Sequence, residues 1–114
     1  MNEMFAQGDL LIERVADVEP SGAMMSADQT GAIVLAEGEL TGHRHAIYER
    51  VTMFRDDALA REIPVGLYVG HVKVSGGPAT LLHEEHAPVS LPEGTYRVRR
   101  QRELEPKDAV LVSD

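Results

Sequence analysis

Short runs of apolar and β-branched residues alternate along the chain with turn-forming residues, a pattern typical of β-strands joined by tight turns. The predicted strands are Gly8–Val15, Ala32–Leu40, His43–Val51, Leu67–Ser75, Ala79–His83, Thr95–Arg102 and Ala109–Val112. Seven or eight strands with almost no helix between them predict an all-β fold, a small barrel or sandwich. Because domains commonly contain about 100–150 residues, we expect residues 1–114 to form a single β-domain.

Three connecting segments have patterns of their own. Residues 19–31 are rich in turn formers and predict a loop, from which Met24 and Met25 are expected to reach the core. Residues 56–63 start with acids and contain good helix formers, so they predict the only helix, about two turns long before Pro64. The Gly76-Gly77-Pro78 turn predicts that the strands on either side of it form a hairpin.

The strand predicted at residues 43–51 has two distinct faces, because side chains alternate across a strand. We expect its inner face to carry His43, His45, Ile47, Glu49 and Val51. His43 and His45 are two residues apart, so they lie about 7 Å apart along the strand. That spacing lets two imidazoles converge on one ion.

The composition narrows the kinds of partner and site. The chain has 19 acidic and 11 basic side chains, and its net charge of −8 repels nucleic acid and anionic membranes, so neither is an expected partner. The N-terminal stretch carries acids and only a short apolar run, which predicts a cytoplasmic protein without a membrane anchor. There is no cysteine, so any metal site must use nitrogen and oxygen ligands.

Four of the five histidines fall in two tight groups, His43 with His45 and His83 with His86. Imidazole is the commonest side-chain ligand of transition metals, so the two groups predict one mononuclear site. The expected cofactor is a divalent ion, Zn, Mn, Fe or Ni. The candidate metal ligands are His43, His45, Glu49, His83 and His86, with Glu84 and Glu85 as further candidates beside them.

The segment Gly42-His43-Arg44-His45 with Glu49 resembles the first half of the first metal motif of the cupin superfamily. That resemblance implies a β-barrel in which His43, His45 and Glu49 are ligands and a later histidine, His83 or His86, completes the set. In the second cupin motif the histidine follows a Pro-x-Gly turn. Here the order is reversed, because His83 and His86 both precede Pro92-Glu93-Gly94. The run HEEHAPVSLPEGTYRVRRQRE is also similar to a small group of uncharacterised bacterial proteins, which brings no function with it.

Alternatives to a catalytic metal stay open at this point. Three protein ligands would leave a coordination position for chemistry and define a metalloenzyme, whereas four would close around a structural ion. In a third interpretation the domain binds no metal. It is then an interaction or assembly module whose histidines form a hydrogen-bonded or pH-responsive network. A partner protein, a small molecule and a homodimer paired through an exposed strand edge all fit the sequence.

Two further groups of residues complete the candidates. A basic cluster near the C-terminus could hold a phosphate or carboxylate, although pairing with acids on neighbouring strands is the simpler expectation. Its members are Arg97, Arg99, Arg100 and Arg102. His71 stands apart from both histidine groups, and we expect it to be structural. The HEEH string is not a protease motif, because its histidines are three residues apart and the helix that such a motif needs has no room.

Overall fold

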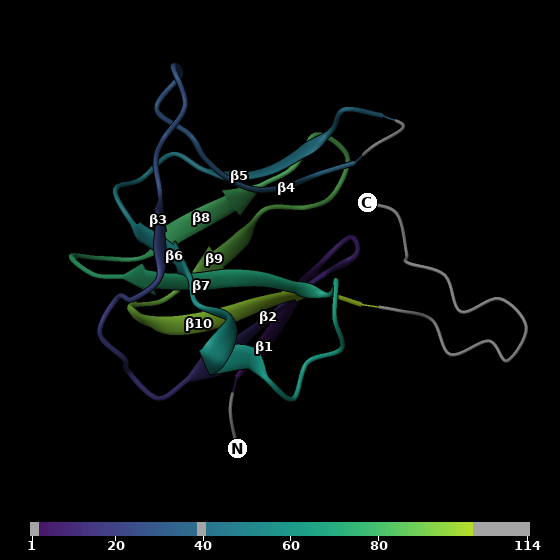
Figure 1. Cartoon of the computed structure of the whole chain (residues 1–114). Coiled ribbons are helices and arrows are strands. Elements are labelled where there is room, and N and C mark those ends of the chain that lie inside the picture. Colours follow the sequence, from purple (N-terminus) through teal and green to yellow (C-terminus); the bar gives the residue numbers. More distant parts are fainter. Residues whose placement is uncertain (1–2, 39–40, 102–114) are drawn as a thin grey trace, which may run out of the picture.

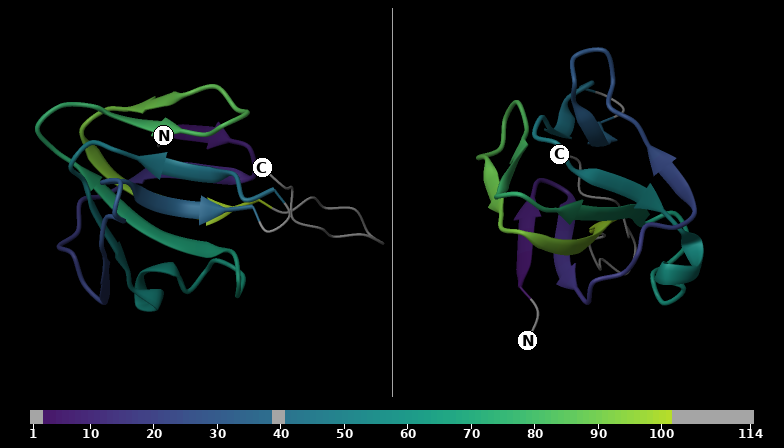
Figure 2. Two further views of the ribbon diagram at one scale, coloured as in Figure 1. Left: turned by 90° about the horizontal axis from the view of Figure 1, so that it is seen from above. Right: turned by 90° about the vertical axis from the view of Figure 1, so that its left-hand side faces the viewer.

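The fold is a sandwich of two antiparallel sheets, not a closed barrel (Figures 1 and 2). The computed structural model describes residues 3–38 and 41–101. Within these ranges there are ten strands and one 3₁₀ turn, which confirms the all-β prediction. No helix of the described part of the chain is long and apolar enough to cross a membrane.

The larger sheet contains six strands in the order β1-β2-β10-β7-β6-β3. Their bounds are β1 (Met4–Gln7), β2 (Leu10–Val15), β3 (Ala23–Met25), β6 (Thr52–Arg55), β7 (Tyr68–Val74) and β10 (Gly94–Arg100). Each of the long strands β2, β7 and β10 places core residues two positions apart, as a sheet with one buried face requires: Leu10 and Ile12, Val72 and Val74, and Tyr96 and Val98. They correspond to three of the predicted strands.

The smaller sheet contains four strands in the order β4-β5-β8-β9. Their bounds are β4 (Ile33–Glu37), β5 (Arg44–Ile47), β8 (Ala79–Leu82) and β9 (Val89–Leu91). The register places Ala46 opposite Leu82 and Ile47 opposite Leu81. This short pairing of β5 with β8 positions the histidines described below.

One apolar core lies between the sheets, and both contribute to it. The larger sheet supplies Leu10, Ile12, Met53, Val72, Val74, Tyr96 and Val98. The smaller sheet supplies Ile33, Leu35, Ala36, Ile47, Ala79, Leu81 and Leu91. A second, smaller cluster of Ala60, Ile63, Leu67 and Tyr68 comes from the 3₁₀ turn and the segment that follows it up to β7.

The predicted hairpin of residues 67–75 with 79–83 is wrong. β7 pairs with β6 and β10 in the larger sheet, whereas β8 pairs with β5 and β9 in the smaller one. Both edges of β7 are therefore occupied, by β6 and β10, and no edge is left to pair with β8. The turn at Gly76 and Gly77, which have φ values of +80° and +119°, carries the chain across from one sheet to the other.

The expectations for two connecting segments are corrected as well. The predicted loop at 19–31 contains β3, which pairs with β6, and its Met24 and Met25 are 59% and 41% exposed instead of reaching the core. The predicted two-turn helix is a single 3₁₀ turn, η1 (Asp57–Ala60), capped by Asp56, whose carboxylate accepts the Ala58 N–H. After Ala60 the chain forms a separate tight turn, in which the Ile63 N–H donates to the Ala60 carbonyl oxygen, instead of continuing as a helix up to Pro64.

Some predicted strands have different limits in the structure. The strand expected at 43–51 ends at Ile47, and a separate strand, β6, starts at Thr52. β1 and β9 were not predicted, and they add to the seven or eight strands expected. The strand expected at Ala109–Val112 lies outside the described residues.

Candidate metal centre

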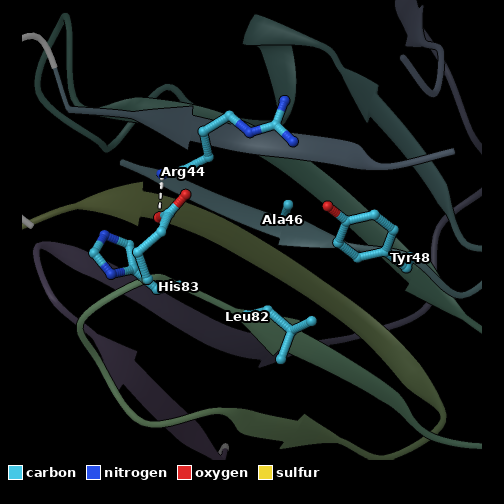
Figure 3. Close-up of a pocket in the computed structure, with 6 residues that line it drawn as sticks. Arg44, Ala46, Tyr48, Leu82 and His83 are labelled. Carbon is cyan, nitrogen blue, oxygen red and sulfur yellow. Dashed lines mark hydrogen bonds between the residues drawn. The ribbon is translucent and has the colours of Figure 1, made fainter. Parts of the chain in front are cut away.

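The two histidine groups meet at one end of the sandwich. Because Ala46 of β5 lies opposite Leu82 of β8, the next residues toward this end are His45 on one strand and His83 on the other. Figure 3 shows His83 close to the start of β5, at Arg44. The antiparallel register therefore brings together residues that are about forty positions apart in the sequence.

His83 lies at the centre of the cluster. Its ring centroid is 5.5 Å from that of His43, 4.4 Å from that of His45 and 4.6 Å from that of His86. His83 and His86 come together because the chain bends directly after β8. The N–H groups of Glu85 and His86 donate to His83 Nδ1 at 3.0 Å and 3.3 Å, which holds that bend.

Glu84 and Glu85 place two carboxylates beside these rings. His43, His83 and Glu84 each offer a ligand atom, and the three atoms lie within 4.8 Å of one another. Glu84 Oε1 also accepts the Arg44 N–H at 2.8 Å, and this hydrogen bond holds the pKa of Glu84 below its usual range. Glu85 Oε1 lies 3.3 Å from His43 Nδ1. Glu84 is therefore an anion at neutral pH, the form that binds a cation.

His45 lies in the interior and is only 1% exposed. Its Nδ1 is 2.9 Å from Oε1 of Gln7, a residue of β1 on the other sheet. The Gln7 amide nitrogen donates to the carbonyl oxygens of Leu81 and Ala87, both at 2.9 Å. With both amide hydrogens used in this way, the oxygen of Gln7 faces His45, so His45 Nδ1 is the donor.

Asp9 faces the other ring nitrogen of His45. Asp9 is 2% exposed, and its Oδ1 lies 3.5 Å from His45 Nε2. Its second oxygen, Oδ2, accepts a hydrogen bond from Nη1 of Arg100. Neither Gln7 nor Asp9 is among the residues predicted from sequence, because the sequence placed Gly8 and Asp9 at the start of a strand that in the structure begins at Leu10, and nothing in it indicates inward polar side chains.

Glu49 does not join the cluster. Its side chain is exposed, and Oε1 accepts the Thr80 N–H at 3.1 Å. Thr80 is near the start of β8, whereas His83 follows its end. The alternation expected along residues 43–51 does not reach Glu49, because β5 ends at Ile47.

The described arginines of the basic cluster lie among acids and carbonyls. Arg97 pairs with Glu13 across the strands at 2.7 Å and with Glu62 at 2.6 Å, and Arg100 binds Asp9. Arg99 Nε lies 3.5 Å from the Arg100 carbonyl oxygen. Arg102 lies outside the described residues.

His71 lies apart from the other four histidines, on β7 of the larger sheet. It is 3% exposed, its Nδ1 is 2.7 Å from the Tyr68 hydroxyl, and its ring stacks on Phe54 at 5.4 Å. Burial is the main reason why its pKa is lowered, and the nearby Arg97 adds to the effect. These contacts agree with a structural role.

A shallow hollow of about 290 Å³ opens beside the cluster (Figure 3). Ala46 and Leu82 form an apolar part of its lining, and Tyr48, 50% exposed, lies at the far end from His83. Arg44 and Glu84 add charged groups next to His83. The hollow gives small molecules a surface directly beside the histidines.

The fold and the site define an antiparallel two-sheet β-sandwich with a histidine and carboxylate cluster at one end. The chain belongs to the family of a domain of unknown function, DUF8820, whose sequence profile matches residues 6–101. This match agrees with the resemblance to an uncharacterised family and gives no support to the cupin resemblance. Comparison with curated proteins and comparison with solved structures each gave no match.

Proposed function

We propose that this domain binds one divalent transition metal ion at the end of the sandwich where the four histidines meet. The observation that carries the proposal is the spacing of the rings around His83, 4.4 to 5.5 Å between centroids. Two imidazoles bound to one ion through nitrogens about 2.1 Å from it place their centroids roughly 4.5 to 5.5 Å apart. The ring spacing thus fits a shared ion.

The donor set narrows the class of metal. Imidazole nitrogens with carboxylate oxygens suit Zn, Mn, Fe and Ni, and the absence of cysteine removes the soft thiolate ligands. The ligands are drawn from the cluster at this end: His43, His45, His83, His86, Glu84 and Glu85. Glu49, bonded to Thr80 at the other end of β8, is not part of the proposed site.

The hollow beside His83 favours an ion that is open to small molecules. A metal ion with three protein ligands keeps a position for water or substrate, where it can act as a Lewis acid, and a neighbouring carboxylate can then move protons. A fourth protein ligand would instead give a structural ion. The coordination number measured by X-ray absorption distinguishes a metalloenzyme from a metal-stabilised interaction module.

A second candidate function has its own support. His83 Nδ1 accepts two backbone N–H groups, and His45 is engaged by Gln7, so parts of the cluster already form a hydrogen-bonded network. Under this alternative the domain is a non-catalytic interaction module that needs no metal. It predicts that a chelator leaves the melting temperature unchanged at neutral pH, whereas a bound ion stabilises the folded state and its removal lowers that temperature.

The test is elemental analysis of purified, untagged protein together with His43→Ala, His83→Ala and, as a matched control, His71→Gln. His71 is the one histidine of the sequence outside the cluster, so its variant should keep the metal. We expect one ion per chain in the wild type and the control, and its loss in both cluster variants. A protein that holds no Zn, Mn, Fe or Ni after reconstitution would contradict the proposal.

A further inference from the structure

The tautomer of His45 has a consequence for the polar groups around it. Gln7 Oε1 lies 2.9 Å from Nδ1, and the Gln7 amide hydrogens are committed to Leu81 and Ala87, so Nδ1 carries a hydrogen. In a neutral imidazole the lone pair is then on Nε2. That nitrogen faces Oδ1 of Asp9.

A lone pair and a carboxylate oxygen repel each other, and here the interior strengthens the repulsion. His45 and Asp9 are 1% and 2% exposed, so water does not screen the pair. Within the described residues, Asp9 Oδ1 accepts no hydrogen bond of normal geometry. A positive charge between the two atoms, a proton or a metal ion, would turn the repulsion into attraction.

The separation of the two atoms is nearer to that of two ligands of one metal ion than to that of a hydrogen bond. A charge-assisted hydrogen bond between nitrogen and a carboxylate oxygen is about 2.7–2.9 Å long. His45 Nε2 and Asp9 Oδ1 are 3.5 Å apart. Two ligand atoms about 2.1 Å from one ion, at octahedral or tetrahedral angles, lie roughly 3.0–3.4 Å from each other.

We propose that Asp9 is a ligand of the metal ion, bound through Oδ1 next to His45 Nε2, with Gln7 as the residue that positions the His45 ring. This inference rests on the proposed metal binding and adds the first ligand from the larger sheet. Arg100 holds the other oxygen of Asp9, which fixes the carboxylate and leaves Oδ1 for the ion. A ligating histidine that donates its second N–H to a fixed oxygen is the usual support around metal sites.

The assignment gives the ion a place in the architecture. Asp9 belongs to the turn between β1 and β2, whereas His45 lies on β5 of the smaller sheet. An ion bound by both Asp9 and His45 would connect the two sheets at the end of the sandwich where the histidines meet. The buried Asp9 carboxylate would also supply the ion with one negative charge.

The first experiment titrates Zn²⁺, with no other ligand, into metal-free wild type, Asp9→Asn and Glu13→Gln by calorimetry. Glu13 is the matched control, because it is also a carboxylate paired with an arginine, Arg97, but lies outside the cluster. We expect Asp9→Asn to weaken zinc binding at least tenfold and Glu13→Gln to leave it unchanged. Equal affinity for the wild type and Asp9→Asn would overturn the assignment.

The second experiment needs no variant and so remains decisive if Asp9→Asn fails to fold. Long-range ¹H–¹⁵N spectra of the zinc-loaded wild type should show His45 with a hydrogen on Nδ1 and a metal-bound Nε2. A doubly protonated His45 in the zinc-loaded protein would overturn the assignment. If His43 or His83 binds zinc and His45 does not, the proposed metal binding is supported and the assignment of Asp9 is wrong. If zinc does not bind at all, both proposals are wrong.

Discussion

Gln7 Nε2 donates a 2.9 Å hydrogen bond to the carbonyl oxygen of Leu81, and so joins β1 of the larger sheet to β8 of the smaller one inside the sandwich. The same nitrogen binds the Ala87 carbonyl, which fixes the segment that follows His86. A single buried amide therefore links both sheets and the histidine segment.

We expect Gln7→Leu to lower the free energy of unfolding by about 2 kcal/mol or more, because the buried Leu81 carbonyl, the partly buried Ala87 carbonyl and the His45 N–H lose their partner. Urea unfolding measures the change. Met4→Leu, at an exposed position of the same strand, should stay within about 0.5 kcal/mol of the wild type. Equal effects of the two variants would contradict the role given to Gln7.

The position of Glu49 gives a prediction that separates the observed cluster from the cupin-like ligand set. Glu49→Ala should retain the metal content of the wild type, because its carboxylate binds the Thr80 N–H at the far end of β8. Glu84→Ala should weaken zinc binding, because Glu84 lies within reach of His43 and His83. Elemental analysis and zinc titration of both variants provide the measurement. Metal loss in Glu49→Ala alone would favour the cupin-like set instead.

His71 should make the stability of the fold sensitive to mildly acidic pH. Burial lowers its pKa in the folded state, so below the ordinary value of about 6.5 the unfolded chain binds more protons than the folded one. Its contribution to stability is therefore present above pH 6.5 and is lost as the pH falls toward the folded-state pKa. Asp56 and Glu62 oppose the shift, and Arg97 adds to it.

Chemical unfolding at several pH values between 7.5 and 5 measures this effect. We expect His71→Gln to have a shallower loss of stability with falling pH than the wild type. The four cluster histidines are present in both proteins, so the difference between the two slopes reports His71. Identical pH slopes would show that His71 does not carry the effect.

Position 22 requires a glycine, both because its φ is positive and because a side chain there would clash with a neighbouring backbone. Its φ is +73°, and a Cβ at this position would lie 2.2 Å from the carbonyl oxygen of Arg55. We expect Gly22→Ala to destabilise the fold by about 2 kcal/mol or more, because both the strain and the backbone clash must be relieved. Gly31→Ala is the matched control, since its φ of +88° carries the strain with nothing within 4 Å. If thermal unfolding shows equal losses, the clash is not the cause.

The sequence predicted the strands whose apolar residues alternate clearly, and it missed those without that signal. β2, β7 and β10 have regular inward positions, such as Ile12, Val72 and Val98. β1 has no regular alternation, and β9 contains only three residues. Pairing was harder to predict, because a Gly-Gly-Pro turn suits a hairpin and a crossover between sheets equally well.

Only the part of the candidate site that depends on the spacing of histidines along the sequence could be predicted. The two histidine groups indicated a meeting point, and the rings of His43 and His83 do meet. The inward positions of Gln7 and Asp9 depend on the packing of β1 and β2 against the smaller sheet, which no local pattern encodes. The expected position of Glu49 does not hold, because β5 ends at Ile47, where its pairing with both β4 and β8 stops, and no local pattern encodes that limit.

The position of β10 determines the order in which the chain can assemble during synthesis. This strand pairs with β2 on one side and with β7 on the other, and Thr95 lies opposite Val15. Until β10 leaves the ribosome, β2 keeps one edge of unpaired N–H and C=O groups along its whole length, and such edges are sites of aggregation. The nascent chain should therefore remain dependent on chaperones until its last described strand has emerged.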